Sequence, residues 1–179
     1  MSILAFYAPY PGAGKTLAAR WLARRLFLRR ISFSTPLRYA VRDIISYPHL
    51  PPWAHISDPK EKEEKIKGRD VSWRELMVAV GNACRSLTPD FWARLMARHM
   101  DMYPWDYVVD DLRFQNEYDF LRARGAKIIR IENPGRKIVT TATEGRLEGN
   151  RFDAVIANTK ESLRGYLCDV QEVATSLLE

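Results

Sequence analysis

A glycine-rich segment near the amino terminus constrains the fold of this chain more than any other feature. Residues 9–16 read PYPGAGKT, and a continuous apolar run at residues 3–8 precedes them. After the loop, Ala18, Leu22 and Leu26 recur every four residues. The apolar run is typical of a strand buried on both faces, and the four-residue spacing is typical of an amphipathic helix. The order of strand, glycine loop and helix predicts an α/β fold with a parallel sheet.

The same two patterns alternate along the rest of the chain. Further strands are predicted at residues 30–34, 107–112, 127–132 and 154–157, and helices at residues 36–46, 73–87, 91–100, 117–124 and 163–178. Ser72 and Glu75 form a capping box at the start of one of these helices. Prolines predict a loop at residues 47–59. We expect one domain over residues 1–179, a three-layer sandwich in which a parallel sheet of about five strands has helices on both faces.

The glycine loop has the composition of a phosphate-binding turn, because backbone amides at the start of a helix can surround an anion. The predicted nucleotide contacts are Gly12, Ala13, Gly14, Lys15 and Thr16. Lys15 would reach the β- and γ-phosphates, and Thr16 would offer its hydroxyl to Mg²⁺. Pro9 stands where the pattern G-x-x-x-x-G-K-[ST] has glycine, and it removes one N–H. The fold class is therefore predicted as P-loop NTPase-like, and the alternative is a turn that only caps the helix.

Two carboxylates follow the predicted strand at residues 107–112. Asp110 and Asp111 could hold Mg²⁺ directly or through water, and Asp111 is the preferred ligand. The alternative is that both acids cap the next helix or pair with Arg113. No glutamate directly follows them, which disfavours a motor that hydrolyses ATP.

No serine or histidine stands out as a nucleophile or base. A phosphate acceptor explains this, because a phosphate with a second pKa near 6 is already a nucleophile. Catalysis would then depend on positioning and on arginines that neutralise charge. The candidates are Arg38, Arg85, Arg113 and one or more of Arg136, Arg146 and Arg151. Trp92 is a candidate for stacking on a base, although such residues are more often part of a core.

Several segments in a fixed order resemble the phage deoxynucleoside monophosphate kinase family, a branch of the P-loop nucleoside monophosphate kinases. After the loop come FSTPLR (33–38), RELMVAVGNACR (74–85), PDFW (89–92), DLRFQNE (111–117), IIRIENP (128–134) and RFDAVIAN (151–158). The order of these segments is more specific than any one of them. Pro9 and Asn133 depart from the family pattern, which leaves contacts on the adenine side open.

The resemblance implies ATP and Mg²⁺ as cofactors and a nucleoside monophosphate as acceptor. It implies that Asp111 and Arg113 face the reacting phosphates, and that Arg74, Gly81 and Arg85 line the monophosphate side. The catalytic set is then Lys15, Arg85, Asp111 and Arg113, the substrate set adds Arg38, Arg74, Gly81 and Trp92, and Arg136 is assigned to ATP. Residues 47–101 are the candidate acceptor-binding segment, and residues 134–151 the candidate lid.

Two other hypotheses about function stay open. The net charge of +6 attracts anions of any kind. A P-loop kinase for another small acceptor, such as dephospho-CoA or a sugar, keeps the same fold. A nucleic-acid-binding P-loop protein is disfavoured, because the pattern of arginines near the first helix is better suited to a solvated face. Cys84 and Cys168 match no metal or disulfide spacing, and no segment resembles a signal peptide or a membrane span. We expect a cytoplasmic protein, in the host cytoplasm if it is viral, and a homodimer stays open.

Overall fold

The computed structural model describes residues 1–45, 60–134, 146–159 and 162–179, which form two compact units. The first unit contains residues 1–32 and 97–179, and the second contains residues 33–96. The predicted loop at residues 47–59 and most of the predicted lid, with Arg136, lie outside the described residues. No helix in the described ranges is long and apolar enough to cross a membrane.

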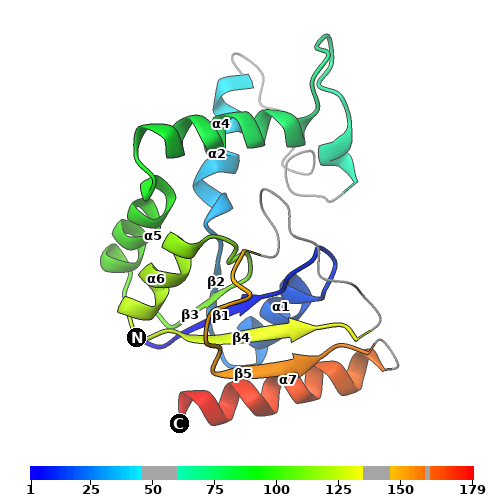
Figure 1. Cartoon of the computed structure of the whole chain (residues 1–179), viewed down its shortest axis with the longest axis vertical. Coiled ribbons are helices and arrows are strands. Elements are labelled where there is room, and N and C mark those ends of the chain that lie inside the picture. Colours follow the sequence, from blue (N-terminus) through cyan, green and yellow to red (C-terminus); the bar gives the residue numbers. More distant parts are fainter. Residues whose placement is uncertain (46–59, 135–145, 160–161) are drawn as a thin grey trace. The chain divides into compact units, whose positions relative to one another are not determined.

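The first unit is built on a parallel sheet of five strands, as predicted (Figure 1). The strands are β1 (Ile3–Tyr7), β2 (Arg29–Ile31), β3 (Tyr107–Val109), β4 (Lys127–Glu132) and β5 (Ala154–Ala157). Their order is β2-β3-β1-β4-β5, and every pair is parallel. The central strand β1 pairs Ala5 with Val109 on one side and with Ile128 on the other. The carboxyl ends of the strands therefore share one edge of the sheet, where ligands bind in such folds.

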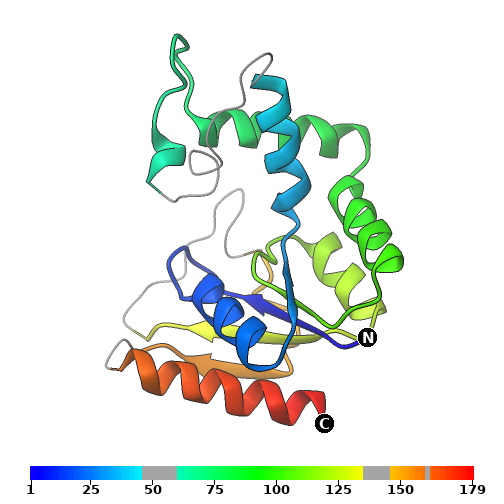
Figure 2. The ribbon, with the colours of Figure 1, turned by 180° about the vertical axis from the view of Figure 1, so that it is seen from behind.

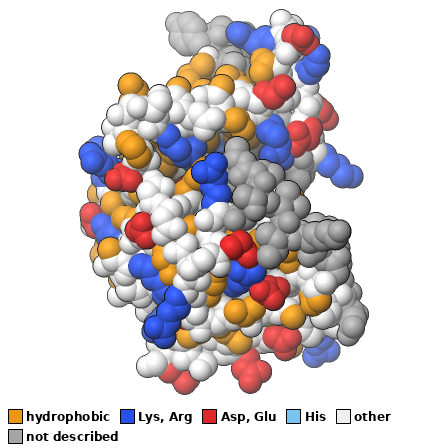
Figure 3. Space-filling view, in the orientation of Figure 1, with side chains coloured by type: hydrophobic (Ala, Val, Ile, Leu, Met, Phe, Trp, Pro, Cys, Tyr) orange, Lys and Arg blue, Asp and Glu red, His pale blue; other side chains and the backbone are white. Residues whose placement is uncertain are grey.

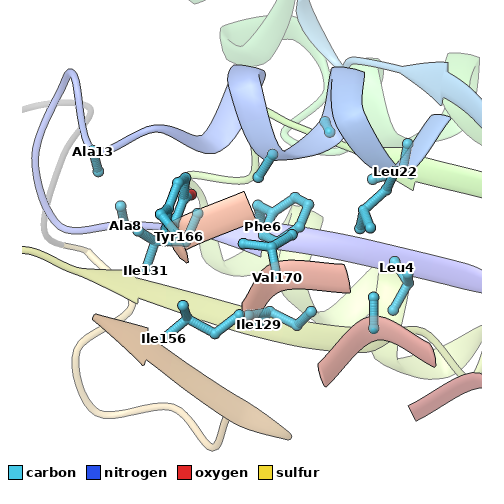
Figure 4. Close-up of a cluster of buried hydrophobic side chains, with 14 of the residues drawn as sticks. Leu4, Phe6, Ala8, Ala13, Leu22, Ile129, Ile131, Ile156, Tyr166 and Val170 are labelled. Atoms are coloured by element: carbon cyan, nitrogen blue, oxygen red, sulfur yellow. The ribbon is translucent and has the colours of Figure 1, made fainter. Parts of the chain in front are cut away.

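Helices cover both faces of this sheet. On one face, α1 (Lys15–Arg25) and α7 (Leu163–Leu178) pack on buried side chains such as Leu4 and Phe6 (Figures 2 and 4). On the other face, Tyr7 stacks on Phe152 with ring centres 5.2 Å apart. Tyr118 from α6 (Gln115–Ala123) meets the same phenylalanine edge-on. The predicted three-layer α/β fold is confirmed.

The second unit is helical. It contains α2 (Ser34–Ile45), the short 3₁₀ turn η1 (Glu61–Glu63) and α4 (Trp73–Leu87), and α5 (Phe91–Met102) begins in it. Its core consists of Val41, Ile66 and Trp73, with Leu37 and Met77 packed against them. Apolar side chains from α2 and α4 thus meet in one cluster, which holds the two helices together.

Local hydrogen bonds explain where the helices begin. The predicted capping box of α4 is present, because Ser72 Oγ accepts the Glu75 N–H at 3.2 Å and Glu75 Oε2 accepts the Ser72 N–H at 2.7 Å. The bond from the Ser72 N–H, followed by the one that Ser72 Oγ donates to the same carboxylate, lowers the pKa of Glu75. At the start of α6, the Glu117 carboxylate accepts the N–H of Phe114 at 3.2 Å. The helix therefore begins two residues before the predicted 117.

Two predicted strands are shorter in the structure. The prediction of 30–34 is corrected to Arg29–Ile31, because Ser34 already begins α2. The prediction of 107–112 is corrected to Tyr107–Val109, because Val109 is the last residue of β3 that pairs with a neighbouring strand. The chain that follows Val109 is thereby released from the sheet and carries the two acidic residues.

Candidate active site

The glycine loop joins β1 to α1 and depends on left-handed backbone at two positions. Gly12 has φ 71° and Gly14 has φ 103°. Residues with a Cβ rarely adopt such values, so glycine is required at both positions. Gly14 is also the N-cap of α1, and it has no side chain that could bond the first amides of the helix. The loop and the helix start can therefore present backbone N–H groups to an anion.

Lys15 is the first residue of α1 and is only 8% exposed. Its Nζ lies 3.5 Å from the carbonyl oxygen of Ala8, which directly follows β1. The side chain therefore runs back along the loop to the end of the central strand. Thr16 follows it and is exposed. This places an ammonium group and a hydroxyl beside the same loop, as the motif predicted.

The proline at the start of the loop does not remove the turn. Pro9 is buried, and both glycines beyond it keep positive φ. Tyr10 is buried in the core between the sheet, α1 and α7, and its hydroxyl accepts the backbone N–H of Asn133, just after β4. The first half of the loop is thus fixed to the neighbouring strand through an aromatic side chain.

The two acids after β3 are held by side chains from the neighbouring strand β2 and from the residue that follows it. Asp110 is 5% exposed, and its Oδ2 accepts a hydrogen bond from Arg30 Nη1 at 2.8 Å. Asp111 is half-buried, and its Oδ2 accepts a hydrogen bond from Ser32 Oγ at 2.7 Å. β3 lies beside β1, whose carboxyl end continues into the glycine loop. Both acids therefore stand at the same edge of the sheet as the loop.

Arg113 lies in the segment between β3 and α6, and its backbone is fixed by a buried acid. Glu117 Oε2 accepts the N–H of Arg113 at 3.0 Å. The guanidinium carbon of Arg146 lies 5.8 Å from the ring centre of the neighbouring Phe114. The structure therefore brings Arg146 to the segment that carries Arg113.

Arg151, another predicted lid arginine, lies at the opposite end of the sheet. Its carbonyl oxygen accepts hydrogen bonds from Tyr118 and Arg122, both at 2.6 Å. Two residues later, the backbone N–H of Asp153 donates to the carbonyl oxygen of Ile128, near the start of β4, at 2.9 Å. This is the amino end of the strands, so Arg146 rather than Arg151 stands on the side of the glycine loop.

An ionic network holds the segment after Arg146 against the sheet. Glu148 accepts hydrogen bonds from the Tyr7 hydroxyl at 2.9 Å and from Arg130 Nη2 at 2.8 Å. Tyr7 and Arg130 face each other across β1 and β4. Burial and the bond to Glu148 raise the pKa of Tyr7, so its hydroxyl stays protonated and donates. The network anchors the chain directly after Arg146 over the carboxyl end of β1.

In the second unit, four of the residues predicted on the acceptor side lie on α2 and α4, and the structure brings Gly81 and Arg85 together. A Cβ on Gly81 would lie 3.3 Å from both Arg85 Nη1 and Leu37 Cδ2, so glycine makes room for the guanidinium and for α2. Arg38 is the next residue on α2 and is half-buried. Arg74, at the start of α4, pairs with Glu63.

Trp92 is 3% exposed and donates from Nε1 to the Gly81 carbonyl oxygen at 3.2 Å. This bond gives Trp92 a packing role between α4 and α5. Stacking on a base stays a prediction.

Sequence reasoning gave no role to several residues that support the loop and the acids. They are Tyr10, Arg30, Ser32, Asn158 and Tyr166. Only Asn158 carried a signal, because an asparagine between a strand and the last helix is part of the family resemblance. The others act through contacts with residues far away in the sequence, and no local pattern marks them.

A parallel sheet with a glycine loop, a buried lysine and two acids directly after the neighbouring strand defines a P-loop nucleotide-binding protein. Residues 42–165 match the sequence model of the deoxynucleotide monophosphate kinase family, and the chain belongs to that family. It is therefore a phosphotransferase that acts on nucleotides.

A relative and a solved structure agree with this family and fold. A protein of Acanthamoeba polyphaga mimivirus, named "Putative deoxynucleotide monophosphate kinase", is 28% identical over 172 residues, covering 83% of this chain and 84% of the relative. The structure of a dephospho-CoA kinase from Campylobacter jejuni is similar with a TM-score of 0.51 and 17% identity, covering 98% of this chain and 97% of that chain. At that identity, the similarity to the dephospho-CoA kinase supports the fold alone.

Proposed function

We propose that this enzyme transfers the γ-phosphoryl group of ATP, in the presence of Mg²⁺, to a deoxynucleoside monophosphate. The observation that carries the proposal is the glycine loop, with its two left-handed glycines and buried Lys15, in a member of this family. Lys15 would neutralise the β- and γ-phosphates, while amides of the loop would hold their oxygens. Gly12, Ala13, Gly14 and Thr16 complete this set.

The oxygen atoms near the loop fit Mg²⁺. Thr16 offers a hydroxyl and Asp111 a carboxylate, and both are hard oxygen ligands of the kind that Mg²⁺ prefers. Asp110 is more deeply buried and bonded to Arg30, which supports Asp111 as the ligand. Among the described residues, no three His, Cys, Asp or Glu side chains gather into a metal site. Phosphate oxygens and water would therefore supply the remaining ligands, and the ion would neutralise charge on the triphosphate.

The transfer needs no protein nucleophile. An oxygen of the acceptor phosphate attacks the γ-phosphorus, and the bond from that phosphorus to the β–γ bridging oxygen breaks. ADP and the diphosphate of the acceptor are the products. Arg113 is proposed to face the transferred group, and Arg146 is a second candidate because it lies beside the same segment. Their fixed charges would stabilise the spread of negative charge in the transition state.

The acceptor is proposed to bind residues of the second unit. Arg38 and Arg85 would pair with its phosphate, because a planar guanidinium matches phosphate oxygens in a bidentate manner. Gly81 and Arg74 are proposed to line the same side, and Trp92 to support α4 from behind. Arg136 is proposed to contact ATP, and it lies outside the described residues.

Binding of nucleic acid is the less favoured function. In Figure 3, acidic side chains lie among the basic ones on the face that is drawn, so the described basic residues form no continuous stripe there. A phosphate backbone is usually tracked by an uninterrupted row of basic side chains. The net charge of +6 is better explained by anionic small-molecule substrates.

A panel of acceptors tests the proposal. Purified enzyme with ATP and Mg²⁺ is assayed for ADP release with each deoxy- and ribonucleoside monophosphate, with dephospho-CoA and with a sugar. We expect at least one deoxynucleoside monophosphate to accelerate ADP release over the rate without acceptor. If only dephospho-CoA or the sugar does so, the acceptor assignment is wrong. Acceleration by none of them overturns the proposed reaction.

The choice between the two acids leads to a separate prediction. Asp111→Asn should raise the Mg²⁺ concentration for half-maximal rate by about tenfold or more, because the carboxylate charge beside the ion is lost. Asp110→Asn should leave this Mg²⁺ dependence near that of the wild type. It should lower the unfolding temperature instead, because Arg30 loses its buried counter-charge. The reverse pattern would assign the ion to Asp110.

A further inference from the structure

Two side chains from residues 158–166 donate hydrogen bonds to backbone carbonyl oxygens of the glycine loop. Asn158 Nδ2 donates to the Ala13 carbonyl oxygen at 2.9 Å. Tyr166 Oη, on α7, donates to the Gly14 carbonyl oxygen at 3.3 Å. Figure 4 shows Tyr166 pointing from α7 toward the loop that carries Ala13. Two consecutive peptide carbonyls of the loop are thus bonded by side chains from other elements.

Fixing a carbonyl also fixes an amide. In a planar trans peptide, the C=O of one residue and the N–H of the next point in opposite directions. Asn158 therefore orients the Gly14 N–H through the Ala13 carbonyl, and Tyr166 orients the Lys15 N–H through the Gly14 carbonyl. Both N–H groups are turned away from the side chains that hold the carbonyls, which is the side from which an anion would be bound.

Both donors are themselves fixed. The Asn158 N–H donates to the Glu132 carbonyl oxygen at 2.6 Å, so the ladder between β4 and β5 continues to this residue. Tyr166 is buried, and burial raises its pKa, so the hydroxyl stays protonated and can donate. The Gly14 carbonyl also accepts the Ala18 N–H at 2.9 Å, which aligns the same peptide with α1.

The contacts leave no room for a side chain at Gly14. A Cβ there would lie 2.9 Å from Asn158 Nδ2 and 3.0 Å from Tyr166 Oη. The two donors therefore approach the loop backbone as closely as packing allows, and the absence of a Cβ at residue 14 permits both bonds at once.

We propose that Asn158 and Tyr166 are positioning residues for ATP, which pre-orient the Gly14 and Lys15 amides toward the phosphates. This inference rests on the proposed binding of ATP in the loop. Neither residue needs to touch the nucleotide. Without the Asn158 donor, the peptide between Ala13 and Gly14 should rotate more freely. Without the Tyr166 hydroxyl, the next peptide should keep its bond from the Ala18 N–H and become less tightly held. In both cases the loop would lose more entropy when ATP binds, so the affinity for ATP would fall.

The test measures ATP affinity in Asn158→Leu, which keeps the size of the side chain, and in Tyr166→Phe, which removes only the hydroxyl. We expect the Kd for ATP by calorimetry and the KM for ATP each to rise about two- to tenfold, the range of one net hydrogen bond. The KM for the acceptor should stay within about twofold, because that site is not altered. Gln171→Leu is the matched control on α7, since it removes only the 3.2 Å bond to Trp21 Nε1.

The outcomes separate the inference from the function on which it rests. Unchanged ATP affinity in both variants overturns the positioning role, as does a parallel rise of both KM values, which would indicate general loosening of the fold. If Asn158→Leu does not fold, Tyr166→Phe decides alone. Lys15→Ala is measured alongside. If it still binds ATP as tightly as the wild type, the proposed nucleotide site is wrong, whatever the two positioning variants do.

Discussion

Replacement of Lys15 by alanine should lower kcat/KM for ATP by about 10²- to 10³-fold, the loss typical of removing one preorganised charge-stabilising group. The ammonium group is almost fully buried beside the Ala8 carbonyl oxygen and the glycine loop. Its charge is therefore screened little by water and acts strongly on the γ-phosphate. ADP release with a deoxynucleoside monophosphate as acceptor, at saturating Mg²⁺, measures the effect.

Arg20→Ala provides the matched control for Lys15→Ala. Arg20 is a basic residue on the same helix, and its side chain is exposed. Removing it changes the net charge by the same amount, so an effect of overall charge on anion binding would appear in both variants. We expect Arg20→Ala to keep kcat/KM within about twofold of the wild type, because an exposed charge is screened by solvent. If Lys15→Ala stays within tenfold of the wild type, the γ-phosphate is bound elsewhere.

Gly14→Ala should lower kcat/KM by about 100-fold, because a shift of the loop of about 1 Å is enough to misplace the reacting groups. Two effects act at this position. A φ of 103° costs a residue with a Cβ roughly 1–3 kcal/mol, and the new Cβ would meet Asn158 and Tyr166 at about 3 Å. We expect a lower unfolding temperature by calorimetry and weaker binding of ATP.

Alanine substitutions at two other glycines separate the cost of the left-handed backbone from the effect of the close contacts. Gly125→Ala introduces a Cβ at φ 75° with nothing within 4 Å, so it carries the backbone cost without the contact. Gly149→Ala has open space too, and its φ does not lie in the left-handed region. We expect Gly125→Ala to lower the unfolding temperature and to keep ATP affinity, and Gly149→Ala to change neither. If Gly14→Ala binds ATP like Gly125→Ala, the contacts with Asn158 and Tyr166 do not shape the loop.

Much of the fold could be predicted because the local patterns agree with it. The predictions at residues 127–132, 154–157 and 163–178 coincide with β4, β5 and α7. Buried parallel strands form apolar runs, and the glycine loop identifies the first crossover. The boundaries at residues 32–34 and 110–117 were harder to predict, because hydrogen bonds of side chains, and not the apolar pattern, mark them. Ser32 bonds to Asp111, which is 79 positions away, whereas the bond from the Phe114 N–H to Glu117 is local and caps the start of α6.

The candidate site was only partly predictable for the same reason. Lys15 and Thr16 were placed by a motif whose chemistry is local. Asn158 reaches Ala13 across 145 positions of sequence, and Ser32 reaches Asp111 across 79, so only the packed sheet brings them together. Asp110 likewise pairs with Arg30, 80 positions earlier in the sequence. Sequence motifs can identify the catalytic and binding residues of a site. The residues that hydrogen-bond to them depend on the order of the strands in the folded sheet.

The central position of β1 has a consequence for synthesis of the protein. This strand leaves the ribosome well before its two neighbours, which are β3, at residues 107–109, and β4, at residues 127–132. The side chains that brace the phosphate turn, Asn158 and Tyr166, emerge later still. Contacts so distant in sequence form slowly and late. We therefore expect a nascent chain to bind ATP tightly only after Asn158 and Tyr166 have left the ribosome and reached the glycine loop.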